Sequence, residues 1–210
     1  MATSAVLTAS EVSKLKKAPA VEGVLPLFHQ RWSPRSFADR EVSPALLQKV
    51  FEAARWAASS YNEQPWRFFL GRRGDETYAK IFESLGEFNQ KWAQTAPVLI
   101  LGVAKTRFSH SGAENRVALF DLGAASSYLT LQAAALGLAT HQMAGFDPEK
   151  ARKLFGIPAE YATGSVIALG YQGEPAALED ERLIQQETAA RTRKPLGEIV
   201  LGEWGEAARL

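Results

Sequence analysis

The sequence predicts a mixed α and β fold, built as one domain in which helices outweigh strands. Two continuous apolar runs, residues 96–104 and 163–171, are typical of strands buried on both faces of a sheet. Around them lie segments whose apolar residues recur at helical spacing. The length of 210 residues fits one domain, and a content of 46% hydrophobic and 22% charged residues is normal for a globular protein.

The first predicted helix begins after Ser43, because serine is a favoured N-cap and Pro44 suits the first helical position. Residues 67–70 then predict a short strand, and residues 75–85 predict a second helix. The buried strand over 96–104 follows.

A long helix is predicted over residues 114–137, and its small residues at 123–127 allow another backbone to approach closely. Asp147 and Pro148 cap a further helix that ends at Gly156. The second buried strand, over 163–171, comes next.

Residues 174–188 are polar and poor in large apolar side chains, which indicates the start of a surface arm rather than core. We interpret the arm as residues 174–210, reaching a second subunit, and expect a last strand within 192–200. Residues 1–20 are interpreted as an N-terminal extension whose order the sequence leaves open. Residues 21–210 then form the single domain.

Composition excludes several classes of protein. A net charge of +1 argues against a nucleic-acid binder, and the absence of cysteine excludes disulfides, iron–sulfur clusters and thiol nucleophiles. Three histidines without paired spacing predict no metal site.

The apolar stretch 117–140 carries Asp121 and many small residues, so a helix buried in protein is favoured over a membrane span. Residues 1–20 lack the pattern of a signal peptide. We therefore expect a cytoplasmic protein that binds neither nucleic acid nor membrane.

Two arginines flank a serine and a proline near the N-terminal end of the domain. Pro34 disfavours a regular helix between Arg31 and Arg35, so Ser33 and both guanidiniums extend from an irregular backbone. The rigid donor fork of arginine suits phosphate. Taken alone, two surface arginines in a loop before a helix remain the favoured alternative.

A long polar segment, residues 59–64, separates the first helix from the first strand. Asn62 and Gln64 offer amides with both donor and acceptor groups, which can pair with a heteroaromatic rim, and Trp66 offers an apolar wall. The alternative is a loop at the end of a helix, with Trp66 in the core.

Two shorter segments carry weaker signals. The cations at 191–194 either pair with Arg31 on a phosphate or form a solvated tail. Gly145, within 141–147, allows close backbone approach to the edge of a planar ligand, or belongs to an ordinary connection between helices.

Together and in this order, these segments resemble the nitroreductase family of FMN-dependent oxidoreductases. The resemblance covers residues 27–200, and its most specific part is the Ser-Ser-x-Asn-x-Gln-Pro-Trp block at 59–66. It implies an α+β fold with a central, mostly antiparallel sheet flanked by helices. It also implies a homodimer, with the long helix at the interface and the C-terminal arm crossing to the partner.

The resemblance implies two FMN sites at the dimer interface, each lined by both chains. Arg31 and Ser33 would contact the phosphate or ribityl chain, and Arg191 and Arg193 would complete the phosphate site. The implied cofactor-binding residues are Arg31, Trp32, Ser33, Arg35, Ala58, Ser59, Ser60, Asn62, Gln64, Met143, Ala144, Gly145, Arg191 and Arg193.

The implied reaction is a ping-pong transfer of hydride from NAD(P)H, through flavin N5, to a nitroaromatic, a quinone or a similar conjugated acceptor. No side chain is assigned as catalytic, because the cofactor carries the chemistry. The chain has no GxGxxG motif after a strand, so the nucleotide would be a transient substrate. Two alternatives stay open: the same fold with another reaction (dehalogenation, enone reduction or flavin cleavage), or a flavin-binding protein without turnover.

Overall fold

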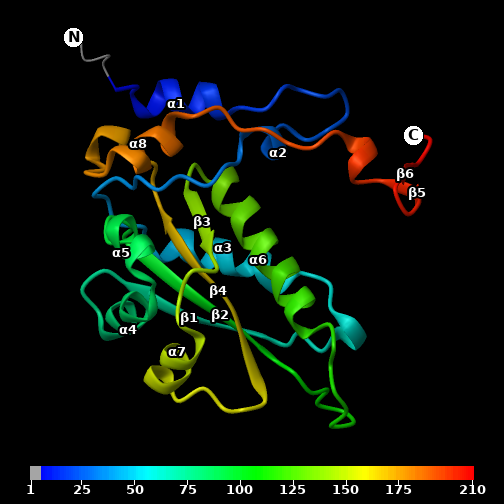
Figure 1. Cartoon of the computed structure of the whole chain (residues 1–210). Coiled ribbons are helices and arrows are strands. Elements are labelled where there is room, and N and C mark those ends of the chain that lie inside the picture. Colours follow the sequence, from blue (N-terminus) through cyan, green and yellow to red (C-terminus); the bar gives the residue numbers. More distant parts are fainter. Residues whose placement is uncertain (1–5) are drawn as a thin grey trace.

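The computed structural model describes residues 6–210, so the first five residues of the N-terminal extension lie outside it. A four-stranded sheet, in the order β1–β2–β4–β3, lies among the helices (Figure 1). Every neighbouring pair of strands is antiparallel, which confirms the predicted α+β class with its central antiparallel sheet. The strands are β1 (Trp66–Arg72), β2 (Val98–Lys105), β3 (Ala139–Met143) and β4 (Tyr161–Gly170).

The two central strands are the two apolar runs of the sequence. In β2 every residue except Lys105 is buried, and Ile100 lies opposite Ile167 of β4 and Leu70 of β1. Successive side chains of a strand point to opposite faces. Leu99 therefore joins one hydrophobic cluster while Ile100 joins the other.

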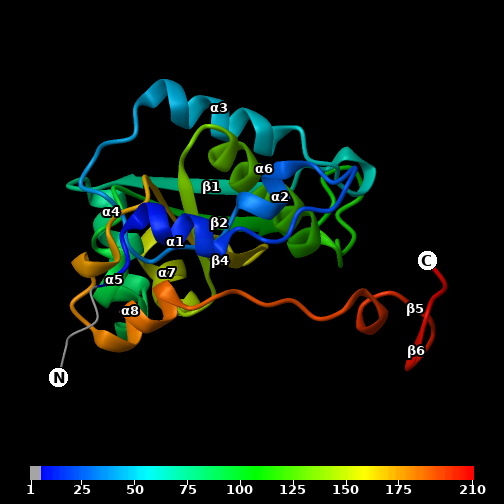
Figure 2. The ribbon, with the colours of Figure 1, turned by 90° about the horizontal axis from the view of Figure 1, so that it is seen from above.

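Helices cover both faces of this sheet, as the view from above shows (Figure 2). On one face lie α3 (Pro44–Arg55) and α6 (Ala118–Ala135), and on the other lie α4 (Glu76–Ser84), α5 (Glu87–Ala93) and α7 (Pro148–Phe155). The predicted caps are present, since Ser43 and Asp147 each accept backbone N–H groups at the start of their helix. Gly156 ends α7 in the left-handed conformation.

Strand β3 was missed, because residues 141–147 were interpreted as a connection between helices. The strand follows α6 closely, after a turn at Gly137 with φ of 74°. Its polar His141 and Gln142 hide the strand pattern, and within residues 6–210 it is an edge strand that pairs with β4 alone.

The interpretation of residues 174–188 as a surface arm is wrong. This segment forms a short 3₁₀ turn, η2 (Pro175–Ala177), and helix α8 (Glu181–Thr188), with Leu178 and Leu183 buried in the core. The segment has few large apolar residues, but Leu178 and Leu183 are both buried, and this is enough to attach it to the core.

The strand expected within 192–200 is also wrong. Those residues run as coil into η3 (Leu196–Glu198), and a small hairpin of β5 (Leu201–Glu203) and β6 (Glu206–Ala207) follows. From residue 189 onward the chain forms the C-terminal arm, which runs past the body and ends away from it (Figure 2).

The N-terminal segment packs against α8. Helix α1 (Ala9–Lys16) has a capping box between Thr8 and Glu11, and buries Val12. The Lys16 ammonium donates to the Gln186 carbonyl at 3.0 Å. A short helix, α2 (Pro26–Gln30), then leads the chain across α6.

None of the helices in residues 6–210 is both long enough and apolar enough to cross a bilayer.

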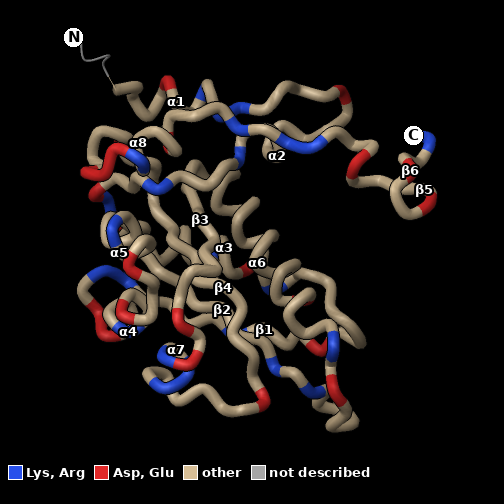
Figure 3. Tube along the Cα trace, viewed as in Figure 1, with Lys and Arg blue, Asp and Glu red and all other residues tan. Residues whose placement is uncertain are grey.

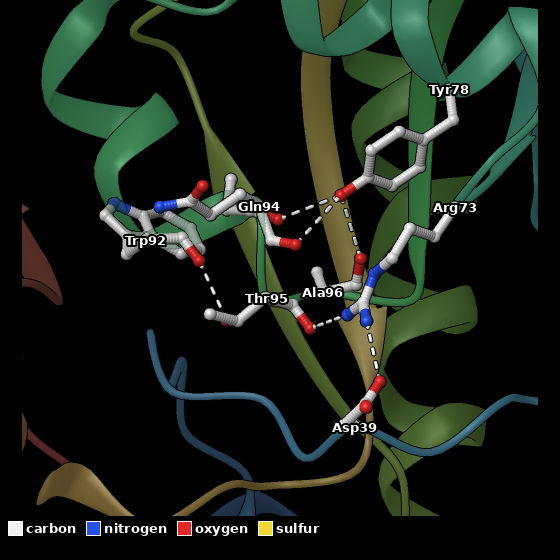
Figure 4. Close-up of polar contacts among 8 residues, drawn as sticks. Asp39, Arg73, Tyr78, Trp92, Gln94, Thr95 and Ala96 are labelled. Atoms are coloured by element: carbon white, nitrogen blue, oxygen red, sulfur yellow. Dashed lines mark hydrogen bonds and ion pairs between the residues drawn. The ribbon is translucent and has the colours of Figure 1, made fainter. Parts of the chain in front are cut away.

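A polar network joins β1, α4 and the turn before β2 (Figure 4). The buried Tyr78 hydroxyl lies 2.9 Å from the Ala96 carbonyl and 3.2 Å from the Ala93 carbonyl, and burial raises its pKa. Arg73 reaches the Thr95 carbonyl and pairs with Asp39 at 2.7 Å. The network fixes the turn from α5 into the central strand.

We expect Tyr78→Phe to lower the free energy of unfolding by about 1 kcal/mol, because carbonyls buried around the hydroxyl lose their donor. Urea unfolding measures this. The control is Tyr128→Phe at an exposed position of α6, expected to change stability by less than about 0.5 kcal/mol. Equal effects of the two substitutions would contradict the structural role of the network.

Candidate functional site

The irregular segment predicted around Pro34 follows α2 and is held rigidly. Pro34 and Ser36 are buried, and the Ser36 hydroxyl donates to the Glu174 carbonyl at 2.6 Å. The Gly173 N–H donates to the Ser36 carbonyl at 2.8 Å. Two segments far apart in sequence therefore fix the backbone from which Arg31 and Arg35 extend.

Five cationic side chains gather beside this segment, and we call them the cation cluster. Figure 3 shows Lys and Arg where α1, the chain after α2 and the C-terminal arm lie side by side. Burial lowers the pKa of four members, and the positive charge of the fifth, Arg193, lowers the pKa of Arg31 further. The members are Lys16, Arg31, Arg35, Arg191 and Arg193.

The arm reaches this segment through Arg191. Its guanidinium donates to the Arg31 carbonyl at 2.5 Å and also to the His29 carbonyl. Burial lowers the pKa of Arg31, and the like charges of Arg191 and Arg193 lower it further. Arg191 and Arg193 therefore lie near Arg31, whereas their predicted binding of one phosphate together with Arg31 stays a prediction.

One buried carboxylate, Glu187 of α8, lies among these cations. It is 1% exposed and accepts the backbone N–H groups of Arg35 and Ser36. Burial raises its pKa, while those bonds and the charges of Arg35 and Lys16 lower it.

The cation cluster has more positive charge than its surroundings neutralise. Within residues 6–210, no ion pair shorter than 4.0 Å joins an acid to Arg31, Arg191 or Arg193. In that range the Arg35 Nε is also a buried donor without a partner. Arg31 and Arg191 are half-buried, and charges partly removed from water without a counter-charge are costly. The donor set and its surplus charge therefore fit a phosphate group.

The second predicted group, the polar loop (residues 59–64), lies at the other end of α6. Tyr61, Asn62 and Gln64 all have positive φ, between 49° and 53°, although none is glycine. The Ser60 N–H donates to the buried carboxylate of Asp121 at 3.1 Å. Such strained backbone persists only where neighbouring groups hold it, and it is typical of functional sites.

One chain does not bring the two groups together. Asp121, in the first turn of α6, contacts the polar loop, while Ala134, in its last turn, lines a cavity of about 240 Å³ with Arg31 and Trp32. The 13-residue step from Asp121 to Ala134 corresponds to about 20 Å along α6 at 1.5 Å per residue. A ligand much shorter than this distance cannot touch both groups of one chain.

The third predicted group follows β3. Ala144 and Gly145 are exposed, and the Gly145 carbonyl accepts from the Gly86 N–H at 3.0 Å and from the Asn89 amide at 2.8 Å. A Cβ at Gly145 would lie 2.7 Å from that amide. The Met143 side chain points into the core, so only its backbone is available to a ligand.

The remaining predicted residues have differing surroundings. Ser33 accepts from Arg31 at 3.3 Å, Trp32 is half-buried beneath the Lys16 ammonium, and Ala58 is exposed after α3. Ser59 accepts the Gln64 N–H at 3.0 Å, which closes the polar loop on itself.

His141 is a positioning group that the sequence did not reveal. Its Nδ1 lies 3.0 Å from the Pro34 carbonyl oxygen, and its ring packs at a tilt of 41° against Trp92, with 4.6 Å between the ring centroids. Burial, followed by the charge of Arg35, lowers the pKa of His141 to about 4. A neutral imidazole thus supports the segment that carries the arginines.

Three other residues of the site were also missed: Lys16, Asp121 and Glu187. No local motif marks them, because each acts through a contact distant in sequence. The burial of a charged side chain is the signal that finds them.

No group of three or more His, Asp or Glu side chains in the described part of the chain could hold a metal ion.

Fold and site together define an α+β protein with an antiparallel central sheet and a cationic donor set that fits a phosphate group. A family model described as the nitroreductase family matches residues 29–91 and 71–171. The chain belongs to the nitroreductase family.

Individual relatives agree with this membership. An NADH dehydrogenase of Thermus thermophilus is 30% identical over 180 residues, covering 69% of this chain and 84% of that protein. A solved structure described as an oxidoreductase containing FMN is 32% identical with a TM-score of 0.84, covering 90% of this chain and 96% of that one. A nitroreductase family protein of Clostridium difficile 630 is 27% identical with a TM-score of 0.66, covering 84% and 96%.

The lowered pKa of His141 predicts a pH dependence of stability. In the unfolded chain the imidazole takes up a proton near pH 6.5, but in the folded chain only near pH 4. The unfolded state binds more protons between these values, so stability falls as the pH drops from 6.5 to 4, by about 3 kcal/mol at most.

His141→Asn, which keeps a donor for the Pro34 carbonyl but does not titrate, should lose this component. Urea unfolding of both proteins from pH 4 to 7 measures the difference between the two curves, in which the contributions of the carboxylates cancel. Parallel curves would show that His141 titrates normally in the folded protein.

Proposed function

We propose that this protein is an FMN-dependent oxidoreductase that takes hydride from NAD(P)H and reduces a conjugated acceptor such as a quinone or a nitroaromatic compound. Bound FMN would supply the redox chemistry, accepting hydride at N5 from one substrate and passing it to the next in a ping-pong cycle. Membership of the nitroreductase family supports the reaction class. The FMN of one similar structure and the NADH dehydrogenase name of one relative support the cofactor and the donor.

The surplus charge of the cation cluster is the observation that carries the proposal. A phosphate monoester is the part of FMN that such a site binds, through charge-assisted hydrogen bonds from guanidinium groups. Arg31, Ser33 and Arg193 would hold the phosphate. Arg35 would lie toward the ring, where its positive charge favours the uptake of electrons.

The ring would be held mainly through backbone groups and short polar side chains. The exposed Gly145 region would meet one edge, and the polar loop of a second chain would line the ring and its tail. The residues proposed for this second role are Ala58, Ser59, Ser60, Asn62 and Gln64. Rigid loops suit this task, because a ring held in one orientation leaves one position open to both substrates in turn.

We propose that the protein is a homodimer built through α6 and the arm. Exposed apolar side chains on α6 support this, with Phe120 78% exposed and Leu119 beside it. The arm carries Trp204, which is 97% exposed, and Leu196. Apolar patches of this kind mark interaction surfaces. An antiparallel pair of α6 helices would bring the cation cluster of one chain to the polar loop of the other.

We place the reaction in the cytoplasm, as expected of an enzyme that draws on NAD(P)H. A purified protein that is yellow and releases FMN on denaturation, and that oxidises NADH or NADPH with menadione, would meet the proposal. A colourless protein that takes up no added FMN would overturn it.

Removing a cation should weaken FMN binding. We expect Arg31→Ala and Arg193→Ala each to raise the FMN dissociation constant at least tenfold, since a charge-assisted hydrogen bond contributes about 1.5–3 kcal/mol. Quenching of FMN fluorescence on binding to apoprotein measures this constant. The control is Arg182→Ala, at an exposed position of α8, which should leave it unchanged. Unchanged affinity in both variants would exclude these arginines from the phosphate site.

Deleting residues 196–210 should weaken the dimer while leaving the folded body intact. The deletion removes η3 and the β5–β6 hairpin but keeps α8, whose Leu183 is part of the core. Sedimentation velocity over a range of concentrations should show dissociation at concentrations where the full chain stays dimeric. A deleted chain that remains a tight dimer would assign the interface to α6 alone.

A further inference from the structure

The C-terminal end of α8 and the residues after it contact both ends of the segment 31–36, through two side chains of opposite charge. The Glu187 carboxylate accepts the Arg35 N–H at 2.9 Å and the Ser36 N–H at 3.2 Å. Directly after α8, the Arg191 guanidinium donates to the Arg31 carbonyl at 2.5 Å and to the His29 carbonyl.

We infer that Glu187 is a positioning residue for phosphate binding: it fixes the backbone of residues 31–36 so that Arg31 and Ser33 face the phosphate together. The inference rests on the proposed FMN site and names a residue that acts on it from behind.

The burial of Glu187 favours a fixed geometry. The residue is 1% exposed, and both of its backbone donors come from a segment that contains Pro34 and has no regular hydrogen-bonding of its own. A carboxylate that accepts two backbone N–H groups replaces the strand or helix partners that such a segment lacks.

Neighbouring contacts hold the carboxylate in place. Lys16, buried in the last turn of α1, donates to the carbonyl of Gln186, the residue before Glu187. Its ammonium also lies 5.0 Å from the centre of the Trp32 ring. Helix α1 therefore contacts both the backbone of α8 beside Glu187 and the segment that Glu187 holds.

The position of Glu187 allows a test in which the direction of the change in FMN affinity distinguishes two roles. As a mere negative charge near the site, the carboxylate repels a phosphate, and its neutralisation would tighten FMN binding. As a positioning residue, it aligns the donors, and its neutralisation would weaken FMN binding. The two roles predict opposite shifts for one substitution.

The experiment compares FMN with riboflavin, which lacks the phosphate, on full-length apoprotein. We expect Glu187→Gln to raise the FMN dissociation constant about tenfold and to leave that of riboflavin within twofold, because charge-assisted hydrogen bonds to the backbone are lost. The matched control is Glu181→Gln, which makes the same change of charge at an exposed position of α8. Tighter or unchanged FMN binding by Glu187→Gln would overturn the inference.

Glu187→Asp provides a second variant with the charge retained. Its carboxylate is one methylene shorter and cannot reach both N–H groups, so we expect the same loss of FMN affinity. Wild-type affinity would overturn the inference. Melting temperatures of the apoproteins, with binding measured well below them, separate a change of site geometry from a loss of fold.

A double-mutant cycle shows through which group Glu187 acts. In an Arg31→Ala background, Glu187→Gln should raise the FMN dissociation constant less than threefold, because the contact that it positions is already gone. A full tenfold effect in that background would contradict action through Arg31. If the wild-type apoprotein binds neither flavin, the proposed function itself fails; if it binds FMN and Glu187→Gln binds FMN equally well, only this inference fails.

Discussion

Repulsion among like charges is the constraint on which this structure depends. Lys16, Arg31, Arg35 and Arg191 converge from three separate parts of the chain, and burial lowers the pKa of each. Two kinds of group offset part of this repulsion: backbone carbonyls that accept from Arg191, and the Glu187 carboxylate, which lies near Arg35 and Lys16. Like charges that are partly removed from water cost free energy unless a negative charge lies near them. The phosphate of the proposed FMN would supply that negative charge.

The sheet could be predicted from sequence, but the edges of the fold could not. The two apolar runs became β2 and β4 because continuous burial on both faces leaves an unambiguous pattern. Strand β3 has one neighbour and polar side chains, and α8 places only a few residues in the core, so neither carries a strong periodic signal. In both places the tertiary contacts decide the structure, and a local pattern contains no information on them.

The candidate site divides in the same way. Arg31, Asn62 and Gly145, which are proposed to face the cofactor, stand in recognisable segments of the sequence. Lys16, His141 and Glu187 instead contact the segment 31–36 from other parts of the chain, and no motif encodes such contacts. The resemblance to a family could supply the first set of residues, whereas the second set is visible only in the folded structure.

Asp121 is an unusual residue in the sequence whose presence the structure explains. In the sequence it is the lone charge in an apolar stretch, where it argues against a membrane span. In the structure its buried carboxylate accepts the Ser60 N–H, at the start of a loop with three non-glycine residues at positive φ. Left-handed backbone at such residues is unfavourable, and a strong acceptor fixed on a rigid helix offsets part of that cost. Near the other end of the same helix, Ala134 lines a cavity with Arg31 of the cation cluster, so α6 sets the distance between the two groups of the candidate site. In the proposed dimer, a second chain would bring the two groups together, and the exposed apolar side chains of α6 would then be covered.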